Sequence, residues 1–115
     1  MALLSKTAIL TADDQRYDIV QCPEWGEDGE VRVRGLTAYE QGCITKLVNE
    51  DKRDEVTLKI VQFGCVDENG ERLFSADDTR QLAMKSYKVI ERLGKRIYQL
   101  TGFGDADEIE EARKN

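Results

Sequence analysis

The residues that could carry chemistry in this sequence are its carboxylates, because the chain contains no histidine. Without an imidazole, Ser-His-Asp triads, Cys-His dyads, histidine-ligated zinc and a neutral-pH imidazole base are all excluded. Adjacent acids occur at Asp13–Asp14, Asp77–Asp78 and Glu110–Glu111, but neighbours on a helix point in different directions. General acid–base work also needs a carboxylate whose pKa is shifted by burial in a cleft, and these pairs lie in polar stretches. We interpret them as helix caps and solvated faces.

The three cysteines, Cys22, Cys43 and Cys65, form no C-x-x-C pair and are odd in number. A disulfide framework is therefore not expected, and this use of cysteine is typical of a protein in a reducing compartment. Scattered cysteines without histidine also make a poor zinc site. Two of the three lie inside apolar stretches, where cysteine behaves as a small hydrophobic residue. We expect these cysteines to fill the core and not to hold a metal.

The sequence also does not match the glycine-containing motifs that bind calcium, dinucleotides or phosphates. If Gly70 takes the sixth position of a calcium loop, Cys65 falls at the first and Ala76 at the twelfth, where an acid and a bidentate Glu are needed. Gly102 and Gly104 end a helix rather than open one, and no G-x-x-x-x-G-K-S/T sequence exists. We therefore expect no catalytic residue, no metal and no cofactor, and hence no enzyme.

What remains is surface for binding a partner. Trp25, Tyr87 and Tyr98 are the candidate partner-binding residues, because each is large, amphipathic and placed where a core role is not required. The alternative for Trp25, the sole tryptophan, is that it packs a hairpin against a helix. Tyr87 and Tyr98 lie on one long predicted helix and leave the same two interpretations open.

The length and composition indicate a single acidic globular domain. The 115 residues are 40% apolar and 35% charged. No apolar run approaches the roughly 20 residues of a membrane helix, and the first residues lack the features of a signal peptide, so a cytoplasm is the expected compartment. The net charge of −6 disfavours binding to nucleic acid and to anionic membrane surfaces.

Two runs rich in β-formers predict a hairpin near the N-terminus. Residues 17–25 and 30–34 flank an Asp-Gly turn signal at Asp28–Gly29. The second run alternates strictly, which predicts that its valines face a core while its charges face water. Pro23 cannot donate a ladder hydrogen bond, so the first strand is expected to lie at an edge or to end there.

Capping signals and apolar stripes predict helices elsewhere. Ser5 caps a short N-terminal helix, and Thr37 with Glu40 has the spacing of a capping box. The helix that follows Thr37 carries one apolar stripe: Tyr39, Cys43, Ile44, Leu47 and Val48. Residues 54–64 fit either a strand or a helix; we favour a helix, because Val61 breaks the alternation and Asp54 can cap.

The remaining segments complete an α+β fold. An Asn-Gly turn within 66–74 indicates a miniature hairpin, and 75–78 begins a helix. A long stripe follows to Leu100, with Met84 marking a join between a short helix and a longer one. We expect an N-terminal β-hairpin packed against a bundle of about four to five helices, in a single domain over 1–104. Residues 105–115 are expected to be an acidic C-terminal helix or a frayed tail of that domain.

The motifs in order resemble those of the tail assembly chaperones of siphophages and their prophages. A short "LLSK…IL…ADD" helix precedes "V-x-C-P-E-W-G" and "V-x-V-R-G-L-T". A capped helix follows, then "V-D-E-N-G-x-R-L-F-S-x-D-D", and finally "L-x-G" and "E-E-x-R-K-N". The similarity covers residues 2–115, and its specificity comes from the order and spacing of motifs that are individually weak.

This resemblance implies a non-enzymatic factor in the cytoplasm of a bacterial host. Such chaperones coat the tape measure protein, help tail tube subunits polymerise around it and are absent from the finished tail. Self-association into a ring or spiral is expected for a coat. Many are made as a short form and, by ribosomal frameshifting, as a longer form, and a chain ending "E-A-R-K-N" looks like the short one. The family offers no active-site residues to transfer.

An alternative interpretation remains open from the residues alone. A small acidic inhibitor or regulator from a mobile element would use the carboxylates within 24–30 or 105–111 to occupy a basic site on a host or phage protein. Its binding would depend strongly on salt.

Overall fold

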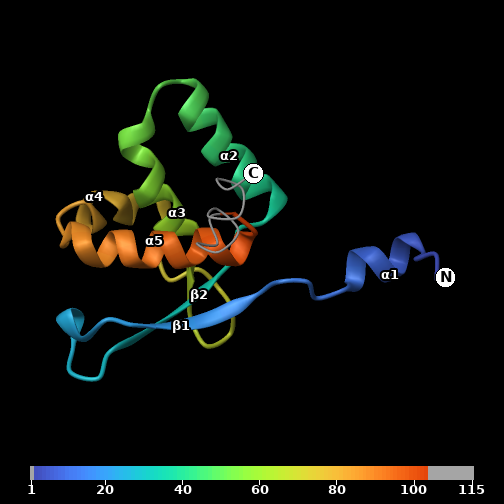
Figure 1. Ribbon diagram of the computed structural model, residues 1–115, viewed down its shortest axis with the longest axis horizontal. Helices are drawn as coiled ribbons and strands as arrows, with labels where there is room; N and C mark the ends of the chain where they lie inside the picture. The colour runs from blue at the N-terminus through green and yellow to red at the C-terminus, as the bar shows by residue number, and fades with distance from the viewer. Residues whose placement is uncertain (1, 104–115) are drawn as a thin grey trace, which may run out of the picture.

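The computed structural model describes residues 2–103, which form a three-stranded antiparallel sheet packed against helices (Figure 1). In chain order the elements are α1 (Lys6–Thr11), β1 (Tyr17–Gln21), β2 (Glu30–Arg34), α2 (Ala38–Asn49), α3 (Val56–Gly64), β3 (Cys65–Val66), α4 (Thr79–Leu82) and α5 (Tyr87–Thr101). Single 3-10 turns lie at Pro23–Trp25, Arg53–Glu55 and Ala76–Asp78. The predicted α+β fold, a hairpin against a helical bundle in one small domain, is confirmed.

The predicted hairpin gains a third strand. β1 and β2 pair in antiparallel register from Tyr17↔Arg34 to Gln21↔Glu30, and Asp28 takes a positive φ of 57° in the connection. β3 adds two residues to the other edge of β2. The Asn-Gly turn then brings Arg72 back to bridge Val66, as the sequence predicts for a miniature hairpin. β1 ends before Pro23 and lies at the sheet edge, which agrees with the expectation for a proline.

The segment over 54–64 is helical, as predicted, but the residue predicted to cap it does not do so. Asp54 lies inside the 3-10 turn that precedes α3, and Glu55 at the N-cap position makes no side-chain capping hydrogen bond. The expectation that Asp54 caps this helix is therefore wrong. Ser5 and Thr37, by contrast, accept hydrogen bonds at the starts of α1 and α2 as predicted. The short helix α4 and the long helix α5 meet around Met84.

The core lies between the sheet and the crossing of α3 with α5. Gly64 allows a close approach there, because a Cβ atom at this position would lie 2.6 Å from the side chain of Ile97. Two ion pairs also fasten β1 and its following turn to α5: Arg96 to Asp18 at 2.7 Å and Arg92 to Glu24 at 2.6 Å. The hydrogen bond from Arg92 lowers the pKa of Glu24 to about 2.

Two patterning expectations differ from the structure. Arg34 on β2 is buried, so the prediction that the charges of this strand face water is wrong at this position. The stripe on α2 is only partly buried: Ile44 is in the core, whereas Tyr39 is 78% exposed. Arg34 is buried because it pairs with Glu40 at the start of α2. Tyr39 is exposed because α2 packs against α3 along one side and leaves its other side open. The predicted acidic segment over 105–115, and Gly104, lie outside the described residues.

Candidate partner-binding surface

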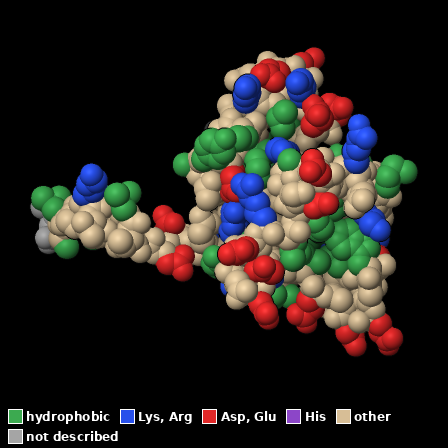
Figure 2. All heavy atoms as spheres, turned by 180° about the vertical axis from the view of Figure 1, so that it is seen from behind, with side chains coloured by type: hydrophobic (Ala, Val, Ile, Leu, Met, Phe, Trp, Pro, Cys, Tyr) green, Lys and Arg blue, Asp and Glu red, His purple; other side chains and the backbone are tan. Residues whose placement is uncertain are grey.

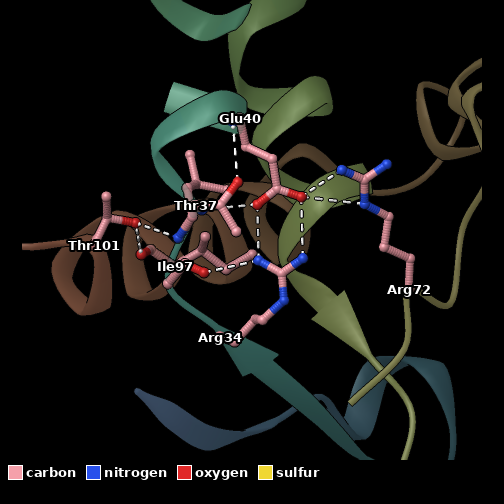
Figure 3. Close-up of polar contacts among 8 residues, drawn as sticks. Arg34, Thr37, Glu40, Arg72, Ile97 and Thr101 are labelled. Atoms are coloured by element: carbon pink, nitrogen blue, oxygen red, sulfur yellow. Dashed lines mark hydrogen bonds and ion pairs between the residues drawn. The ribbon is translucent and has the colours of Figure 1, made fainter. Parts of the chain in front are cut away.

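A buried carboxylate, Glu40, joins β2, α2 and the segment after β3 (Figure 3). Arg34 donates both terminal nitrogens to the two carboxylate oxygens, at 2.8 and 3.0 Å. Arg72 donates Nε to Glu40 Oε2 at 3.2 Å and also pairs with it through Nη2. The backbone N–H of Thr37 completes the capping box at 2.9 Å. The start of α2 is therefore fixed to the sheet by charge as well as by packing.

The electrostatics of Glu40 are those of a structural ion pair. Burial by itself raises the pKa of a carboxyl group, but hydrogen bonds from Arg34, Thr37 and Arg72 outweigh it and lower the pKa of Glu40 to about 2. The carboxylate is therefore ionised at neutral pH and has its oxygens engaged. A group in this state neither donates a proton nor has a free lone pair aimed at a substrate.

An open groove lies between α2, α3 and α4. Its apolar surface comes from Cys43, Leu47, Leu58 and Ala83, and its volume is about 500 Å³. Charged and polar side chains form its rim: Lys46, Glu50, Glu55, Lys59, Thr79 and Arg80. This combination of an apolar floor and a polar rim is typical of a surface that accepts apolar side chains from a partner. We call it the helical groove.

A second hollow of about 340 Å³ continues from the helical groove towards the start of α5. It shares Leu58 and Ala83 with the groove and adds Leu82, Ile90 and Tyr87. We call it the Tyr87 hollow. Tyr87 is 72% exposed and Met84 nearby is 85% exposed. Large side chains as exposed as these are available for a partner, since little of residues 2–103 covers them.

The segment before the sheet is the most exposed apolar part of the described chain. Residues 2–14, which we call the arm, include α1 and have every residue exposed. Figure 2 shows the arm standing clear of the body, with apolar side chains along it and acidic side chains where it joins. Its large apolar residues are Leu3, Leu4, Ile9 and Leu10.

The three residues proposed from the sequence do not form one site. Tyr87 and Tyr98 lie near opposite ends of α5, and Trp25 lies in the turn after β1. Tyr98 is half-buried against the core, with its ring centroid 5.3 Å from that of Phe103. Trp25 is 36% exposed, which leaves both of its interpretations available. Of these three residues, Tyr87 lines the Tyr87 hollow.

The sequence interpretation missed the helical groove and the exposure of the arm. The groove is built from three helices, and only the packing of α2 on α3 leaves Cys43 and Leu47 accessible. The sequence did contain an indication that the arm is exposed, because Ile9 and Leu10 are adjacent on a helix of only six residues. Such a short helix has little stability alone and needs a partner surface.

Within residues 2–103, no group of three or more acidic or cysteine side chains is placed to hold a metal ion. The part of the chain that the structure describes also contains no helix long and apolar enough to span a bilayer.

Comparison with known proteins identifies the fold. No protein-family model matches the sequence, and no curated protein matches it either. Among solved structures, the chain is similar to the tail assembly chaperone of bacteriophage HK97, with a TM-score of 0.65 and 21% sequence identity. The match covers 82% of this chain and 90% of that one. The protein therefore has the fold of a phage tail assembly chaperone, and the resemblance stated from the sequence motifs is confirmed at the level of the fold.

Proposed function

We propose that this protein is a tail assembly chaperone of a long-tailed bacteriophage or prophage. It binds apolar helical segments of the tape measure protein, keeps them dispersed and helps to recruit tail tube subunits around them. It acts in the cytoplasm of the bacterial host, is not retained in the finished tail and catalyses no reaction. The observation that carries this proposal is the shared fold, which spans 90% of the HK97 tail assembly chaperone.

The Tyr87 hollow supports this role as a surface for a partner helix. A helix that docks in a groove inserts apolar side chains spaced by three and four residues. The hollow offers Leu82 and Ile90 at its base and Tyr87 at its border. Met84, next to it, is flexible and polarisable, so it adapts to different apolar side chains. A chaperone that covers many segments of one long chain needs this tolerance.

The charge of the protein supports the same role. A net charge of −6 gives each bound copy a repulsive surface, which opposes aggregation of the coated chain. The coat must also leave during assembly. Many weak contacts along the tape measure protein satisfy both needs, because avidity holds the complex together while each single contact is reversible.

The structure gives less support to an acidic inhibitor. Glu24, the first acid of the proposed 24–30 patch, already pairs with Arg92 and is not free for a basic partner. Glu27, Asp28 and Glu30 remain exposed, or largely so, around the hairpin turn. Their neutralisation is expected to leave partner binding unchanged.

The proposal is tested by co-expressing the tape measure protein with wild type and with a Tyr87→Ser, Met84→Ser variant. We expect wild type to raise the fraction of tape measure protein in the supernatant and the variant to lose most of that effect. Tyr39→Ser is the matched control, because Tyr39 is equally exposed but lies on α2 away from the Tyr87 hollow. Tape measure protein that stays insoluble with wild type contradicts the function; an equal loss in the control contradicts the surface.

A further inference from the structure

We propose that the outer edge of β1, beside α5, binds an extended acidic segment of a partner protein as an additional antiparallel strand. We call this surface the β1 edge; it consists of the strand Tyr17–Gln21 and the adjoining side of α5. The inference goes beyond the proposed function, because this edge is separate from the Tyr87 hollow and takes a partner segment that is extended and not helical.

One side of β1 has no neighbouring strand. The sheet order is β1-β2-β3, so β1 pairs only with β2. In the observed register the even-numbered residues of β1 direct their N–H and C=O groups towards β2, so Tyr17, Ile19 and Gln21 direct theirs to the open side. Both groups of Tyr17, the C=O of Ile19 and the N–H of Gln21 have no hydrogen-bond partner among residues 2–103. Such an edge is a template for a further strand.

The other two outward groups of β1 are capped by side chains. The Asp18 carboxylate accepts a hydrogen bond from the N–H of Ile19 at 2.8 Å, and Arg92 donates to the carbonyl of Gln21 at 3.1 Å. Both caps belong to ion pairs at the surface, in which Asp18 pairs with Arg96 and Arg92 with the turn after β1. Exposed ion pairs contribute little to stability, so an incoming strand can displace both caps at low cost.

A hollow of about 420 Å³ lies directly against this edge. Residues 18–21 of β1 form one wall, and Arg92, Lys95, Arg96 and Gln99 of α5 form the other. The space that an added strand would occupy is therefore open in the described part of the chain. Main-chain hydrogen bonds give such a strand its affinity, and the side chains around it give selectivity.

The charge of the hollow favours an acidic segment. Three cations and one acid, Asp18, line the hollow, although the protein as a whole carries a net charge of −6. Lys95 is exposed and forms no ion pair with any residue from 2 to 103. Carboxylates on the partner would face these cations, so the edge attracts acidic segments and repels basic ones.

The pleat of β1 defines the side-chain pattern of the partner. Asp18 and Val20 lie on the face of the sheet that meets α5, whereas Ile19 lies on the other face and is 44% exposed. In an added strand, side chains opposite Asp18 and Val20 lie beside the cations of α5, and the side chain opposite Ile19 packs on its exposed surface. The segment that fits this edge therefore alternates acidic and β-branched residues.

A peptide titration of the full chain tests the proposal. The probe is acetyl-Glu-Val-Glu-Val-Glu-amide, and the readout is the amide NMR spectrum. We expect shifts at Tyr17, Ile19 and Gln21, and hydrogen exchange of the Gln21 N–H that is at least about fivefold slower in the complex, because this donor gains an acceptor. The counterpart with lysine in place of glutamate should not bind. Shifts confined to other surfaces, or equal binding of the two peptides, overturn the proposal.

Methylation of the peptide nitrogens separates strand addition from attraction between charges. In the proposed pairing the N–H groups of the valines point to β1, and those of the glutamates point to solvent. Methylating the valine nitrogens should therefore weaken binding at least about tenfold, whereas methylating the glutamate nitrogens should have little effect. Equal binding of the two methylated peptides would show that charge alone is recognised and would overturn the proposal.

A charge reversal on the protein provides an independent test. Lys95→Glu should weaken peptide binding at least about threefold, because it places a like charge beside the glutamates. Lys46→Glu on α2 is the matched control: it makes the same change in net charge outside the hollow and should bind as wild type does. Equal affinities of the two variants overturn the proposal. Tape measure protein is absent from these measurements, so their failure leaves the proposed function untouched.

Discussion

At the scale of the residue, Glu40 shows how one side chain serves both local and long-range structure. Its spacing from Thr37 makes it the end of a capping box, which is a local hydrogen-bonding role. Its burial then requires cations, and Arg34 and Arg72 supply them from β2 and from the segment after β3. Because α2 forms one wall of the helical groove, this cluster also sets the geometry of the candidate surface.

We predict that Glu40→Gln lowers the free energy of unfolding by about 3 kcal/mol, because it leaves the buried Arg34 without its counter-charge. Glutamine can still accept the hydrogen bond from the Thr37 amide, so the substitution removes the negative charge and keeps the capping interaction. Urea unfolding followed by circular dichroism measures the effect. Glu50→Gln is the control: its ion pairs are exposed, and we expect less than about 0.5 kcal/mol. Equal losses in both variants would contradict the role given to Glu40.

The same carboxylate predicts a pH dependence with a defined sign. The pKa of Glu40 falls from an ordinary value of 4.5 to about 2 in the folded protein, so its stabilising effect is complete above the unfolded value. The effect is lost as the pH falls towards 2. We expect the stability difference between wild type and Glu40→Gln to be constant near neutrality and to shrink between about pH 5 and pH 2. A difference that stays constant over this range would exclude Glu40 as its source.

At the scale of the element, the crossing of α3 and α5 decides the shape of the core. Gly64 ends α3 against Ile97 of α5, and the absence of a Cβ atom lets the helices approach. α4 is only four residues long, and its connection to α5 leaves Met84 exposed. The helical groove lies between α2, α3 and α4, and the Tyr87 hollow lies between α3, α4 and the start of α5. The packing of the helices therefore determines the shape of the surface as well as that of the interior.

Two glycine-to-alanine changes separate packing from helix propensity. Gly64→Ala places a Cβ atom 2.6 Å from Ile97, and we expect a net loss of about 1–2 kcal/mol in unfolding free energy. Gly42→Ala on α2 meets no atom within 4 Å, so it should stabilise the protein by about 0.5–1 kcal/mol through helix propensity alone. Thermal and urea denaturation measure both. Effects of the same sign would refute the packing argument at Gly64.

At the scale of the whole molecule, the described chain consists of a body that folds around its own core and an arm that contributes nothing to it. Every residue from 2 to 14 is exposed, whereas the core cluster begins with Val20. The arm therefore has no evident role in the stability of a single copy.

Deletion of residues 2–14 is predicted to leave the melting temperature unchanged, within about 1 °C, in dilute solution. At high protein concentration wild type should melt at a higher temperature than the deletion variant, because association of folded copies stabilises them by mass action. Differential scanning calorimetry over a concentration series measures this. A large loss of stability in dilute solution would show that the arm packs on its own body.

The sequence alone determined the order of the elements, most helix starts and the α+β class. These follow from local rules: a serine or threonine accepts a hydrogen bond from an amide three residues away, and periodicity separates helices from strands. The helix at 56–64 was predicted correctly for the same reason. Asp54 failed as a cap because a 3-10 turn intervened, which depends on how the chain leaves α2.

Only the tertiary structure decided which side chains are buried and which surfaces stay open. Arg34 and Glu40 carry charges that local rules place in water, yet they are buried because each neutralises the other across two elements. The helical groove exists because α2, α3 and α4 meet at angles that leave Leu47 and Leu58 partly uncovered. Burial depends on all neighbours at once, and a pattern along one chain segment contains no information about the segments that will pack against it.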